Sequence, residues 1–442
     1  ICVASNDALA LARGEYVVLV DHDDLLAPHA LLSMACWLDA HPYSDLIYSD
    51  EDKVDLQGKR SLPLFKPDWS PTLMASQNYL GHLLCIKRSL LTAIGGFRPG
   101  FEGSQDYDLA LRLSEHASAI THLPDVLYHW RLHAASTSAN SQAKPYAHEA
   151  GRLALEEHLR RKYGDQLNTV KDGAHLFTYQ PRYQGLTGLI SIIIPTFDKA
   201  ELLESCVKSI LLRSTYSNFE IIILNNNSKE PDTFTYFEKA LKQDSRIKIV
   251  NANFPFNCPY LNNFALDFCK GELLVFLNND TQIITPDWLE QMGEIAMLPD
   301  VATVGPMLLY EDGTIQHAGV VVGMGGWADH VFKGQRPEHM PTPFVSNVTT
   351  RNVLAVTGAC MVIERKKFEQ LGRFDEAFEV CGSDVEIGIR AHKQGLQNVY
   401  VATVQAYHLE SKTRDPAAIS QVDFEQSALK YAPYRTAGDP FY

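Results

Sequence analysis

One sequence pattern occurs twice in the chain and limits the folds that the chain can adopt. Residues 14–23 (GEYVVLVDHD) and residues 271–280 (GELLVFLNND) each begin with glycine and glutamate, continue as a short apolar run, and place an aspartate nine residues after the glycine. An apolar run without polar alternation is typical of a strand covered on both faces of a parallel sheet. The pattern therefore predicts two buried strands, each ending in polar or acidic side chains.

The repeat extends along both halves of the chain. Residues 101–112 and residues 379–390 share an acidic residue, a second acid two positions later, and an arginine six positions after the first acid. This period is far longer than the roughly 20 to 50 residues of stacked repeats, so it indicates two copies of one domain. A chain of 442 residues is also long enough for roughly two or three cores. We predict a first domain over residues 1–163, a linker over 164–188 and a second domain over 189–442.

The second copy begins with a segment that has no counterpart ahead of Gly14. This segment contains an apolar strand over residues 189–198, a helix over about 200–213, and a second strand over 219–228. Two parallel strands joined by a helix form a βαβ unit. We therefore predict an α/β fold with two tandem Rossmann-like domains, each with a mostly parallel sheet. The first domain is expected to be truncated at its N-terminus, without the leading βαβ unit.

Charge and cysteine usage exclude several classes of function. The chain has 39 Lys and Arg against 53 Asp and Glu, and this net charge of −14 disfavours nucleic acid and anionic membranes as nonspecific partners. Its eight cysteines form no Cys-x-x-Cys pair, as expected for reduced thiols in a cytoplasmic protein. We find no signal peptide and no apolar stretch near the roughly 18 residues that a membrane span needs.

Three acids, Asp21, Asp23 and Asp24, follow the first of the repeated strands. In open α/β sheets ligands bind at the carboxyl ends of strands, where carboxylate oxygens suit Mg²⁺ or Mn²⁺ and nucleotide phosphates complete the coordination. The same residues also fit an acidic turn that caps a helix over residues 28–38. Because the pattern occurs twice, the ligand-binding interpretation is favoured.

Five further motifs occur in a fixed order in the second half. They are Pro-Thr in an apolar strand, Asn-Asn-Ser after the next strand, Leu-Asn-Asn-Asp, Gly-Ser-Asp-Val-Glu, and His-x-x-Ser-x-x-Arg, within residues 189–198, 219–228, 277–280, 382–386 and 408–414. This ordered set resembles the family 2 glycosyltransferases of GT-A fold. The stretches SDEDK at 49–53, FKPDWSP at 65–71 and DGTIQHAG at 312–319 are similar to tandem bacterial enzymes that build O-antigen and related surface polysaccharides.

The resemblance implies an inverting, metal-dependent transfer of sugar from a nucleotide-sugar donor to a growing bacterial surface glycan. Such chemistry needs a cation, Mn²⁺ or Mg²⁺, to neutralise the leaving diphosphate and a base to deprotonate the acceptor hydroxyl. The implied partners are a UDP- or dTDP-sugar donor and a lipid-linked or growing glycan acceptor. The implied location is the cytoplasm, with peripheral association at the inner membrane as a further option.

In the second domain the resemblance assigns the metal to Asp280 and His408 and the base to Asp384. A single histidine near a chain end is often structural, and Asp384 could instead cap a helix over residues 385–392. If Asp384 begins that helix, its unpaired N–H groups should favour the charged carboxylate. The residues expected at the nucleotide sugar are Pro195, Thr196, Asp198, Asn225, Asn227, Asn263 and Asn278.

This nucleotide end departs from the family pattern at two places. The family usually has an aspartate after the second strand, where residues 225–228 of this chain are NNNS, and residues 278–280 (NND) offer one carboxylate where many relatives have two. An amide can still hydrogen-bond a uracil or thymine ring. With one carboxylate fewer, we expect weaker metal binding before the donor arrives. Asn263 is expected to stabilise a loop facing the nucleotide, or simply to begin a helix.

In the first domain the corresponding residues are Asp21 for the nucleotide, Asp23 and His133 for the metal, and Asp106 as base. His129 competes with His133, because Tyr128-His129 matches Tyr407-His408 in sequence. Three tryptophans could stack on sugar rings or belong to the core, namely Trp69, Trp130 and Trp327.

Two alternative functions remain. One is a binding module, in which one domain has lost activity and only holds a nucleotide sugar or glycan. The other is a nucleotidyltransferase, which usually has a glycine-rich basic loop after its first strand; residues 195–198 (PTFD) do not form such a loop.

Overall fold

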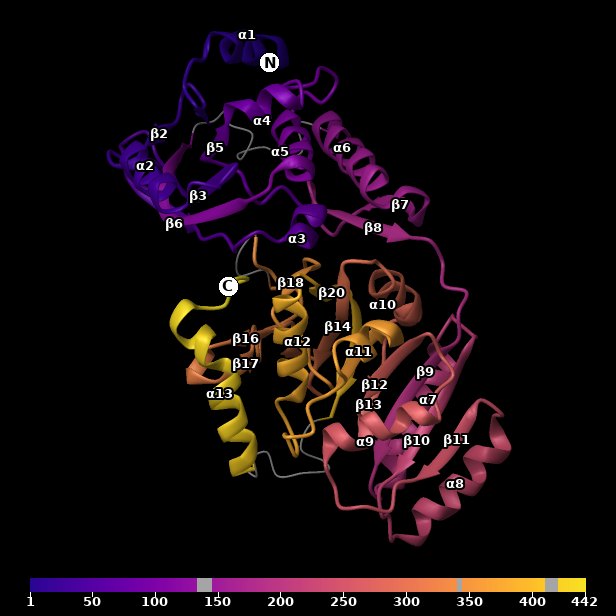
Figure 1. Cartoon of the computed structure of the whole chain (residues 1–442). Coiled ribbons are helices and arrows are strands. Elements are labelled where there is room, and N and C mark those ends of the chain that lie inside the picture. The colour runs from indigo at the N-terminus through magenta and orange to yellow at the C-terminus, as the bar shows by residue number, and fades with distance from the viewer. Residues whose placement is uncertain (133–144, 340–343, 410–419) are drawn as a thin grey trace. The chain divides into compact units, whose positions relative to one another are not determined.

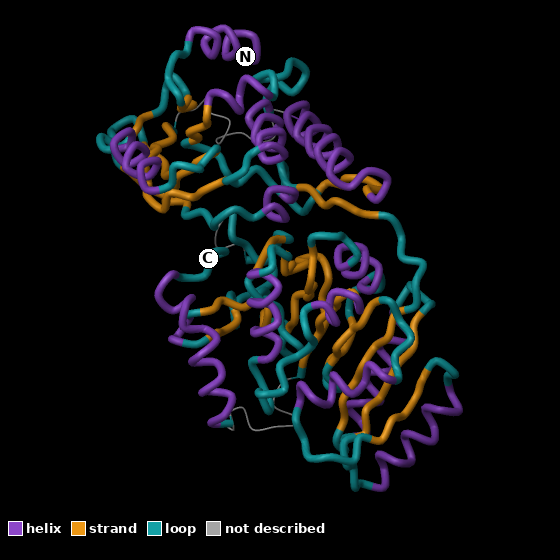
Figure 2. Tube along the Cα trace, viewed as in Figure 1, coloured by secondary structure: helices purple, strands orange, loops and turns teal. Residues whose placement is uncertain are grey.

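The computed structural model describes residues 1–132, 145–339, 344–409 and 420–442 (Figure 1). It separates into two compact units, the first formed largely by residues 1–184 (unit 1) and the second largely by residues 185–441 (unit 2). Strands and helices alternate along both units (Figure 2). The predicted α/β class is therefore confirmed.

The elements of unit 1 are α1 (Cys2–Leu11), β1 (Tyr16–Leu19), β2 (Leu25–Leu26), α2 (Ala30–Ala40), β3 (Leu46–Val54), β4 (Arg60–Leu64), α3 (Pro71–Ser76), β5 (Leu84–Lys87), α4 (Arg88–Ala93), α5 (Gln105–His116), β6 (Ile120–Arg131), α6 (Pro145–Tyr163), β7 (Leu167–Asp172) and β8 (Tyr179–Tyr183). The last two form an antiparallel hairpin within the segment that was expected to be a linker. β7 packs against α6 and β8 against α3, so the hairpin belongs to unit 1.

The elements of unit 2 are β9 (Ile190–Thr196), α7 (Ala200–Arg213), β10 (Phe219–Asn225), α8 (Pro231–Gln243), β11 (Ile247–Asn251), α9 (Cys258–Phe264), β12 (Leu273–Leu277), β13 (Thr281–Ile283), α10 (Trp288–Ala296), β14 (Val301–Leu309), β15 (Ile315–His317), β16 (Val320–Val322), β17 (Ala328–His330), β18 (Arg351–Val353), β19 (Cys360–Glu364), α11 (Arg365–Gln370), α12 (Ser383–Lys393), β20 (Gln397–His408) and α13 (Gln421–Ala437). The predicted leading βαβ unit is present as β9, α7 and β10.

The main sheet of unit 2 has two parts. β11, β10, β9 and β12 are neighbours and all parallel, as the apolar strands predicted. β19 then inserts antiparallel between β12 and β14, and β14 pairs parallel with β20. The sheet is therefore mixed, and the prediction of a mostly parallel sheet is wrong beyond β12.

The sheet of unit 1 repeats the second part of the unit 2 sheet. Its strand order is β1-β5-β3-β6-β2, and the matching order in unit 2 is β12-β19-β14-β20-β13. In both, the successive pairings are antiparallel, antiparallel, parallel and antiparallel. The sequence repeat thus corresponds to a repeated arrangement of strands.

The two strands that revealed the repeat have different surroundings. β12 is buried along its whole length between β9 and β19, as expected for a doubly covered strand. β1 lies at the edge of its sheet, pairs with β5 alone among the described strands, and is only half-buried. The prediction that residues 16–20 are covered in a parallel sheet is therefore wrong, because β1 pairs antiparallel with β5 and no second strand of the described residues encloses it as β9 encloses β12.

Apolar periodicity explains how the helices pack on these sheets. In α7 the buried residues Leu203, Cys206, Val207 and Ile210 recur at the spacing of one helical face. The unit 2 core beneath the helices includes a cluster of phenylalanine rings, Phe276, Phe368 and Phe374, with ring centroids 4.7 to 5.1 Å apart. All eight cysteines lie in the described residues and are free thiols, and five of them are buried.

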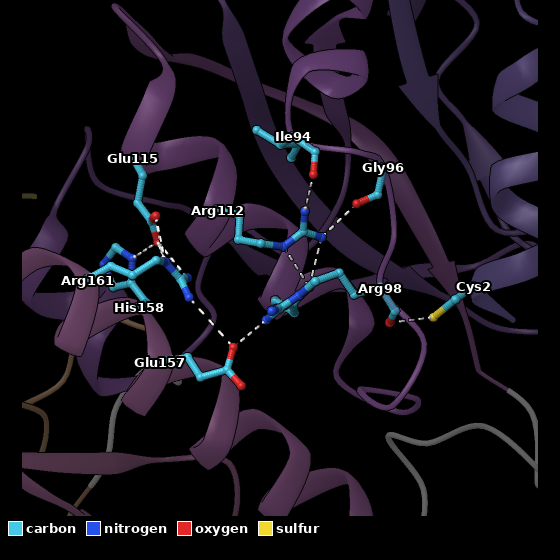
Figure 3. A network of polar contacts seen from close by, with 10 residues as sticks. Cys2, Ile94, Gly96, Arg98, Arg112, Glu115, Glu157, His158 and Arg161 are labelled. Atoms are coloured by element: carbon cyan, nitrogen blue, oxygen red, sulfur yellow. Dashed lines mark hydrogen bonds and ion pairs between the residues drawn. The ribbon is translucent and has the colours of Figure 1, made fainter.

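A polar network joins α5 to α6 in unit 1 (Figure 3). Glu115 on α5 accepts hydrogen bonds from His158 at 2.7 Å and from Arg161 at 2.8 Å, both on α6. Burial alone would raise the pKa of Glu115, but the bonds from His158 and Arg161 outweigh it and lower the pKa to about 2. The ionised carboxylate therefore stabilises the fold, and this contribution is present above the unfolded-state pKa near 4.5 and lost as the pH falls toward about 2.

We predict that Glu115→Gln lowers the free energy of unfolding at pH 7 by about 2 kcal/mol, with a smaller difference from the parent below pH 4. Urea unfolding at pH 7 and pH 3.5 measures both values. Glu149→Gln is the matched control, because Glu149 pairs with Arg152 on the exposed face of α6 and should cost under roughly 0.5 kcal/mol. An equal loss for both variants at pH 7 would contradict the prediction.

Candidate functional site

Asp280 and His408 meet where β12 ends and β13 begins. β13 pairs antiparallel with β20, and the register sets Thr281 opposite His408. As a result Asp280 Oδ1 lies 3.2 Å from His408 Nε2, and both side chains are largely buried. The backbone N–H of Leu409 also donates to the carbonyl of Asp280 at 3.0 Å. The two residues that the resemblance assigned to the metal are therefore adjacent.

Asn278 completes this corner of the site. Its side-chain Nδ2 lies 3.1 Å from His408 Nε2, and its backbone N–H donates to the carbonyl of Ala359 at 3.0 Å. The neighbouring Asn279 donates from Nδ2 to the hydroxyl of Thr196 at 3.1 Å. The turn at 278–280 is thus held to the end of β9 on one side and to the start of β19 on the other.

Asp384 lies in the first turn of α12, where the sequence predicted a helix to begin. The N-cap is Gly382, with φ of 100°, so Asp384 is not the cap. Its Oδ2 accepts a hydrogen bond from the N–H of Gly358 at 2.8 Å, and its Oδ1 accepts one from Val385 at 2.9 Å. Since Ala359 contacts Asn278, Asp384 and the Asp280–His408 pair are both attached to the same short segment before β19.

The protonation behaviour of Asp384 differs from the prediction. Burial raises the pKa of its carboxyl above the ordinary value, and the backbone hydrogen bonds from Gly358 and Val385 offset this only in part. The expectation that the helix start favours the charged form is therefore wrong in its net sign, because desolvation exceeds the effect of the N–H groups. A raised pKa makes the carboxylate a stronger base.

The donor set fits a divalent cation that arrives together with a diphosphate. Asp280 and His408 offer one carboxylate oxygen and one imidazole nitrogen, which suit Mn²⁺. Within the ranges that the structure describes, no group of three or more His, Cys, Asp or Glu side chains could enclose a metal ion. Two protein donors would leave the rest of the coordination to phosphate oxygens, and weak binding of the metal alone stays a prediction.

The residues expected at the nucleotide lie at the carboxyl ends of β9 and β10. Asp198, with φ of 53°, accepts from the backbone N–H groups of Lys229 and Glu230 at 2.7 and 2.8 Å. Asn225 donates from Nδ2 to Asn251 Oδ1 at 2.9 Å. Asp198 therefore ties the loop after β9 to the loop after β10, and Pro195 and Thr196 end β9 beside them.

Two further residues that were expected at the nucleotide, Asn227 and Asn263, bond to loops through their side chains. Asn227 has an exposed side chain whose Nδ2 donates to the carbonyl of Phe254 at 2.8 Å. Asn263 is buried in α9 and donates to the carbonyl of Phe374 at 2.9 Å and to Glu376 Oε1 at 2.8 Å. Asn263 thus holds the loop at 374–376, which precedes α12.

Comparison with known proteins identifies the family. Residues 191–372 match the family model described as glycosyl transferase family 2. Unit 2 contains a family 2 glycosyltransferase domain. The resemblance predicted from the ordered motifs is confirmed, and the match includes β9, β12 and Asp280.

Three relatives illustrate what the chain is similar to. The O-antigen biosynthesis protein RfbC of Myxococcus xanthus is 42% identical over 442 residues, 99% of this chain and 34% of the relative. The uncharacterized protein y4gI of Sinorhizobium fredii is 43% identical over 416 residues, 93% of this chain and 45% of the relative. A GalNAc(5)-diNAcBac-PP-undecaprenol beta-1,3-glucosyltransferase of Campylobacter jejuni is 34% identical over 97 residues, 22% of this chain and 31% of the relative. The chain thus spans about a third to a half of the first two proteins.

Unit 1 presents a histidine that the sequence patterns did not single out. Asp21 is exposed after β1, and its Oδ2 lies 3.6 Å from His82 Nε2. The backbone N–H of His82 donates to Glu51 Oε2 at 2.8 Å, and the buried Lys66 bonds to the same oxygen at 3.1 Å. Glu51 and Lys66 belong to the stretches at 49–53 and 65–71, which were the sequence signal for this group.

Asp106, the predicted base of unit 1, lies in the first turn of α5 as Asp384 does in α12. Its Oδ2 accepts from Asn78 Nδ2 at 3.1 Å. Burial raises the pKa of Asp106, and the charge of His82 opposes this shift. Asp106 is therefore close enough to His82 for the imidazole charge to act on the Asp106 carboxyl.

The residues at the predicted metal position differ between the two units. The turn at 21–24 in unit 1 has the same backbone hydrogen bond as the turn at 278–281, so Asp24 corresponds to Thr281. β2 sets Leu25 opposite His129, which leaves Trp130 as the counterpart of His408. His129 instead bonds to Asp52 at 2.6 Å, and Asp23 has a partly exposed side chain. His133 lies outside the described residues.

The three tryptophans have different contacts. The ring of Trp130 carries the Lys53 ammonium 3.3 Å from its centroid, and Trp69 stacks on Tyr79. Trp327 contacts the guanidinium of Arg435 at 4.4 Å and the ring of Phe424. Trp327 is also partly exposed, so it stays a candidate for contact with sugar.

We predict that UDP and Mn²⁺ bind cooperatively at Asp280, each tightening the other by the same factor, roughly tenfold or more. Asp280→Ala should abolish this coupling and leave the fold intact, whereas Asp232→Ala, which changes an exposed acid on α8, should preserve it. Calorimetry of UDP binding with and without Mn²⁺ gives the factor. If Asp280→Ala shows the same coupling as the parent, the metal does not bind at Asp280.

Proposed function

We propose that the chain is an inverting, metal-dependent glycosyltransferase that moves a sugar from a nucleotide donor to a growing bacterial surface glycan. The observation that supports this most directly is the shared attachment of Asp384 and of the Asp280–His408 pair to residues 358–359. A base and a cation-binding pair on one rigid segment are the two parts that glycosyl transfer needs.

In this proposal Asp280 and His408 would hold a divalent cation, which would supply positive charge to neutralise the leaving diphosphate. Asp384 accepts the proton of the acceptor hydroxyl as that oxygen forms its bond to the anomeric carbon. The bond between the anomeric carbon and the donor phosphate oxygen breaks, and its electron pair leaves with the diphosphate. A single displacement of this kind inverts the configuration. The pKa of Asp384, raised by burial, favours proton uptake from the hydroxyl.

The loops after β9 and β10 are the proposed seat of the nucleotide. There Asp198 fixes the two loops, and Thr196 connects them to the turn that carries Asp280. The exposed side chain of Asn227 and the amide of Asn225 replace the usual acid beside the base, which agrees with a uracil or thymine ring and hence with a UDP- or dTDP-sugar.

Similarity to other proteins supports a polysaccharide acceptor. RfbC of Myxococcus xanthus is described as an O-antigen biosynthesis protein, and the Campylobacter jejuni relative acts on a diphosphoundecaprenol-linked glycan by its description. We therefore propose a lipid-linked or growing glycan as acceptor, and an enzyme that works at the cytoplasmic face of the inner membrane. Across the described part of the chain, no helix combines the length and apolarity of a bilayer span.

A second function is favoured for unit 1. Trp130 takes the place of His408 there, with Lys53 above its ring. We propose that unit 1 binds a glycan or nucleotide sugar without the metal chemistry of unit 2. Asp106→Asn distinguishes a unit 1 that only binds from a unit 1 that also transfers sugar. If unit 1 only binds, the variant should transfer sugar at the parent rate.

The decisive variant for unit 2 is Asp384→Asn. The amide keeps the size of the side chain, so we expect UDP and Mn²⁺ to bind as in the parent while sugar transfer falls by a factor of roughly 10² or more. Transfer from a panel of UDP-, dTDP- and GDP-sugars to a lipid-linked acceptor measures the rate, and calorimetry measures binding. Transfer by Asp384→Asn at the parent rate would show that Asp384 has only a structural role. A parent chain that binds UDP with Mn²⁺ and transfers no sugar from any donor would favour the binding-module function.

A further inference from the structure

The motif at residues 312–319 contributes a side chain to the Asp280–His408 pair from a separate strand. β15 pairs antiparallel with β14 in unit 2, and its middle residue is Gln316. Successive residues of a strand point to opposite faces. Gln316 contacts His408, whereas the next residue, His317, lies with its Nδ1 2.7 Å from His330 Nδ1. Gln316 is itself buried.

The hydrogen bonds of Gln316 define its own orientation. Its Nε2 donates to the backbone carbonyl of His408 at 3.2 Å. Since a carbonyl oxygen can only accept, the amide nitrogen must point there, and the amide oxygen then points to the ring. This oxygen, Oε1, lies 2.6 Å from His408 Nδ1. If the oxygen and the nitrogen of the Gln316 amide were exchanged, the amide oxygen would face the His408 carbonyl and that hydrogen bond would be lost.

The same geometry defines the tautomer of His408. An amide oxygen cannot donate, so His408 Nδ1 must carry the proton that it shares with Gln316. In a neutral imidazole the other nitrogen then has a free lone pair. That nitrogen, Nε2, lies 3.2 Å from Asp280 Oδ1 and 3.1 Å from Asn278 Nδ2, which can donate to it. Nε2 is therefore directed into the corner where Asp280 offers its carboxylate.

We propose that Gln316 is a positioning residue that holds His408 in the Nδ1–H tautomer and so presents Nε2 to a divalent cation at Asp280. This inference rests on the proposed function, in which those two residues hold the metal. Without Gln316 the imidazole can place its proton on Nε2 or rotate, and both changes remove the ligand atom. Outer partners of this kind typically contribute 10- to 100-fold in metal affinity.

Asn278 has a defined part in this arrangement. Its amide donates to the lone pair of His408 Nε2, the atom that the cation would use. Cation binding therefore requires the Asn278 side chain to release Nε2. The backbone of Asn278 stays fixed by its bond to Ala359, so the release is a rotation of the side chain alone.

The first experiment is ¹⁵N NMR of the metal-free protein with labelled histidine, in which His408→Gln assigns the signals. We expect a protonated Nδ1 and an unprotonated Nε2 for His408 in the parent. In Gln316→Leu we expect a mixture of tautomers. A parent signal with a protonated Nε2 and a bare Nδ1 would overturn the proposal without any need for a variant.

The second experiment measures Mn²⁺ affinity in the presence of UDP. Gln316→Leu should weaken it by 10- to 100-fold. Gln282→Leu is the matched control, because Gln282 lies on β13, the strand that pairs with β20, and bonds to Ser205 instead of His408. The control should bind Mn²⁺ as the parent does. Parent-like Mn²⁺ affinity in a folded Gln316→Leu protein would overturn the proposal.

The failures of the two proposals are distinguishable. If Asp280→Ala loses Mn²⁺ binding and Gln316→Leu does not, only the role of Gln316 is wrong. If Asp280→Ala keeps Mn²⁺ binding, the metal site itself is elsewhere. If Gln316→Leu does not fold, Gln316→Met retains the length of the side chain without the amide and takes its place, and the tautomer of the parent still decides the question.

Discussion

The pairing of β12 with β19 is the interaction on which the site depends. Its register sets Leu277 opposite Cys360, so the turn that carries Asp280 emerges beside residues 357–359. The N–H of Gly358 and the carbonyl of Ala359 then bind Asp384 and Asn278 respectively. The hydrogen bonds of a ladder permit little relative movement, so a slip of this register would turn the side chains to the wrong face and separate Asp384 from the Asp280–His408 pair.

Burial gives these polar groups their chemical properties. Asp280 is 4% exposed, and its carboxylate pairs with His408 Nε2 at 3.2 Å, since a buried carboxylate requires a polar partner. Asp384 experiences the same desolvation, which raises its pKa, and the two backbone N–H groups prevent a larger shift. Gln316 and Asn278 provide the remaining partners of His408. Around His408 the site is thus a network that joins side chains from β15, β20 and the turn after β12.

The two units show how one arrangement of strands can carry different chemistry. Both units have the same five-strand order and a turn of acids or amides after the first strand. Each also has an acid in the first turn of a helix, Asp106 in α5 and Asp384 in α12. At the position of His408, however, unit 1 has Trp130 with the Lys53 ammonium above it. In unit 1 the imidazole near the exposed acid comes from His82, ahead of β5. Strand order therefore persists while the residues that contact a ligand change.

The sequence determined the local features of this protein. The repeated strand, the helix over 200–213, the start of α12 and the polar turn with Asp280 after β12 all follow from patterns of neighbouring residues, because strand and helix periodicity is a local property. Features that depend on distant residues could not be predicted in this way. The edge position of β1, the inserted β19, the contact of His82 with Asp21 and the raised pKa of Asp384 each arise from segments far apart in the chain. The motif at 312–319 was visible in the sequence, but only the tertiary structure brought Gln316 to His408, because hydrogen bonding and desolvation are decided by which side chains packing brings together.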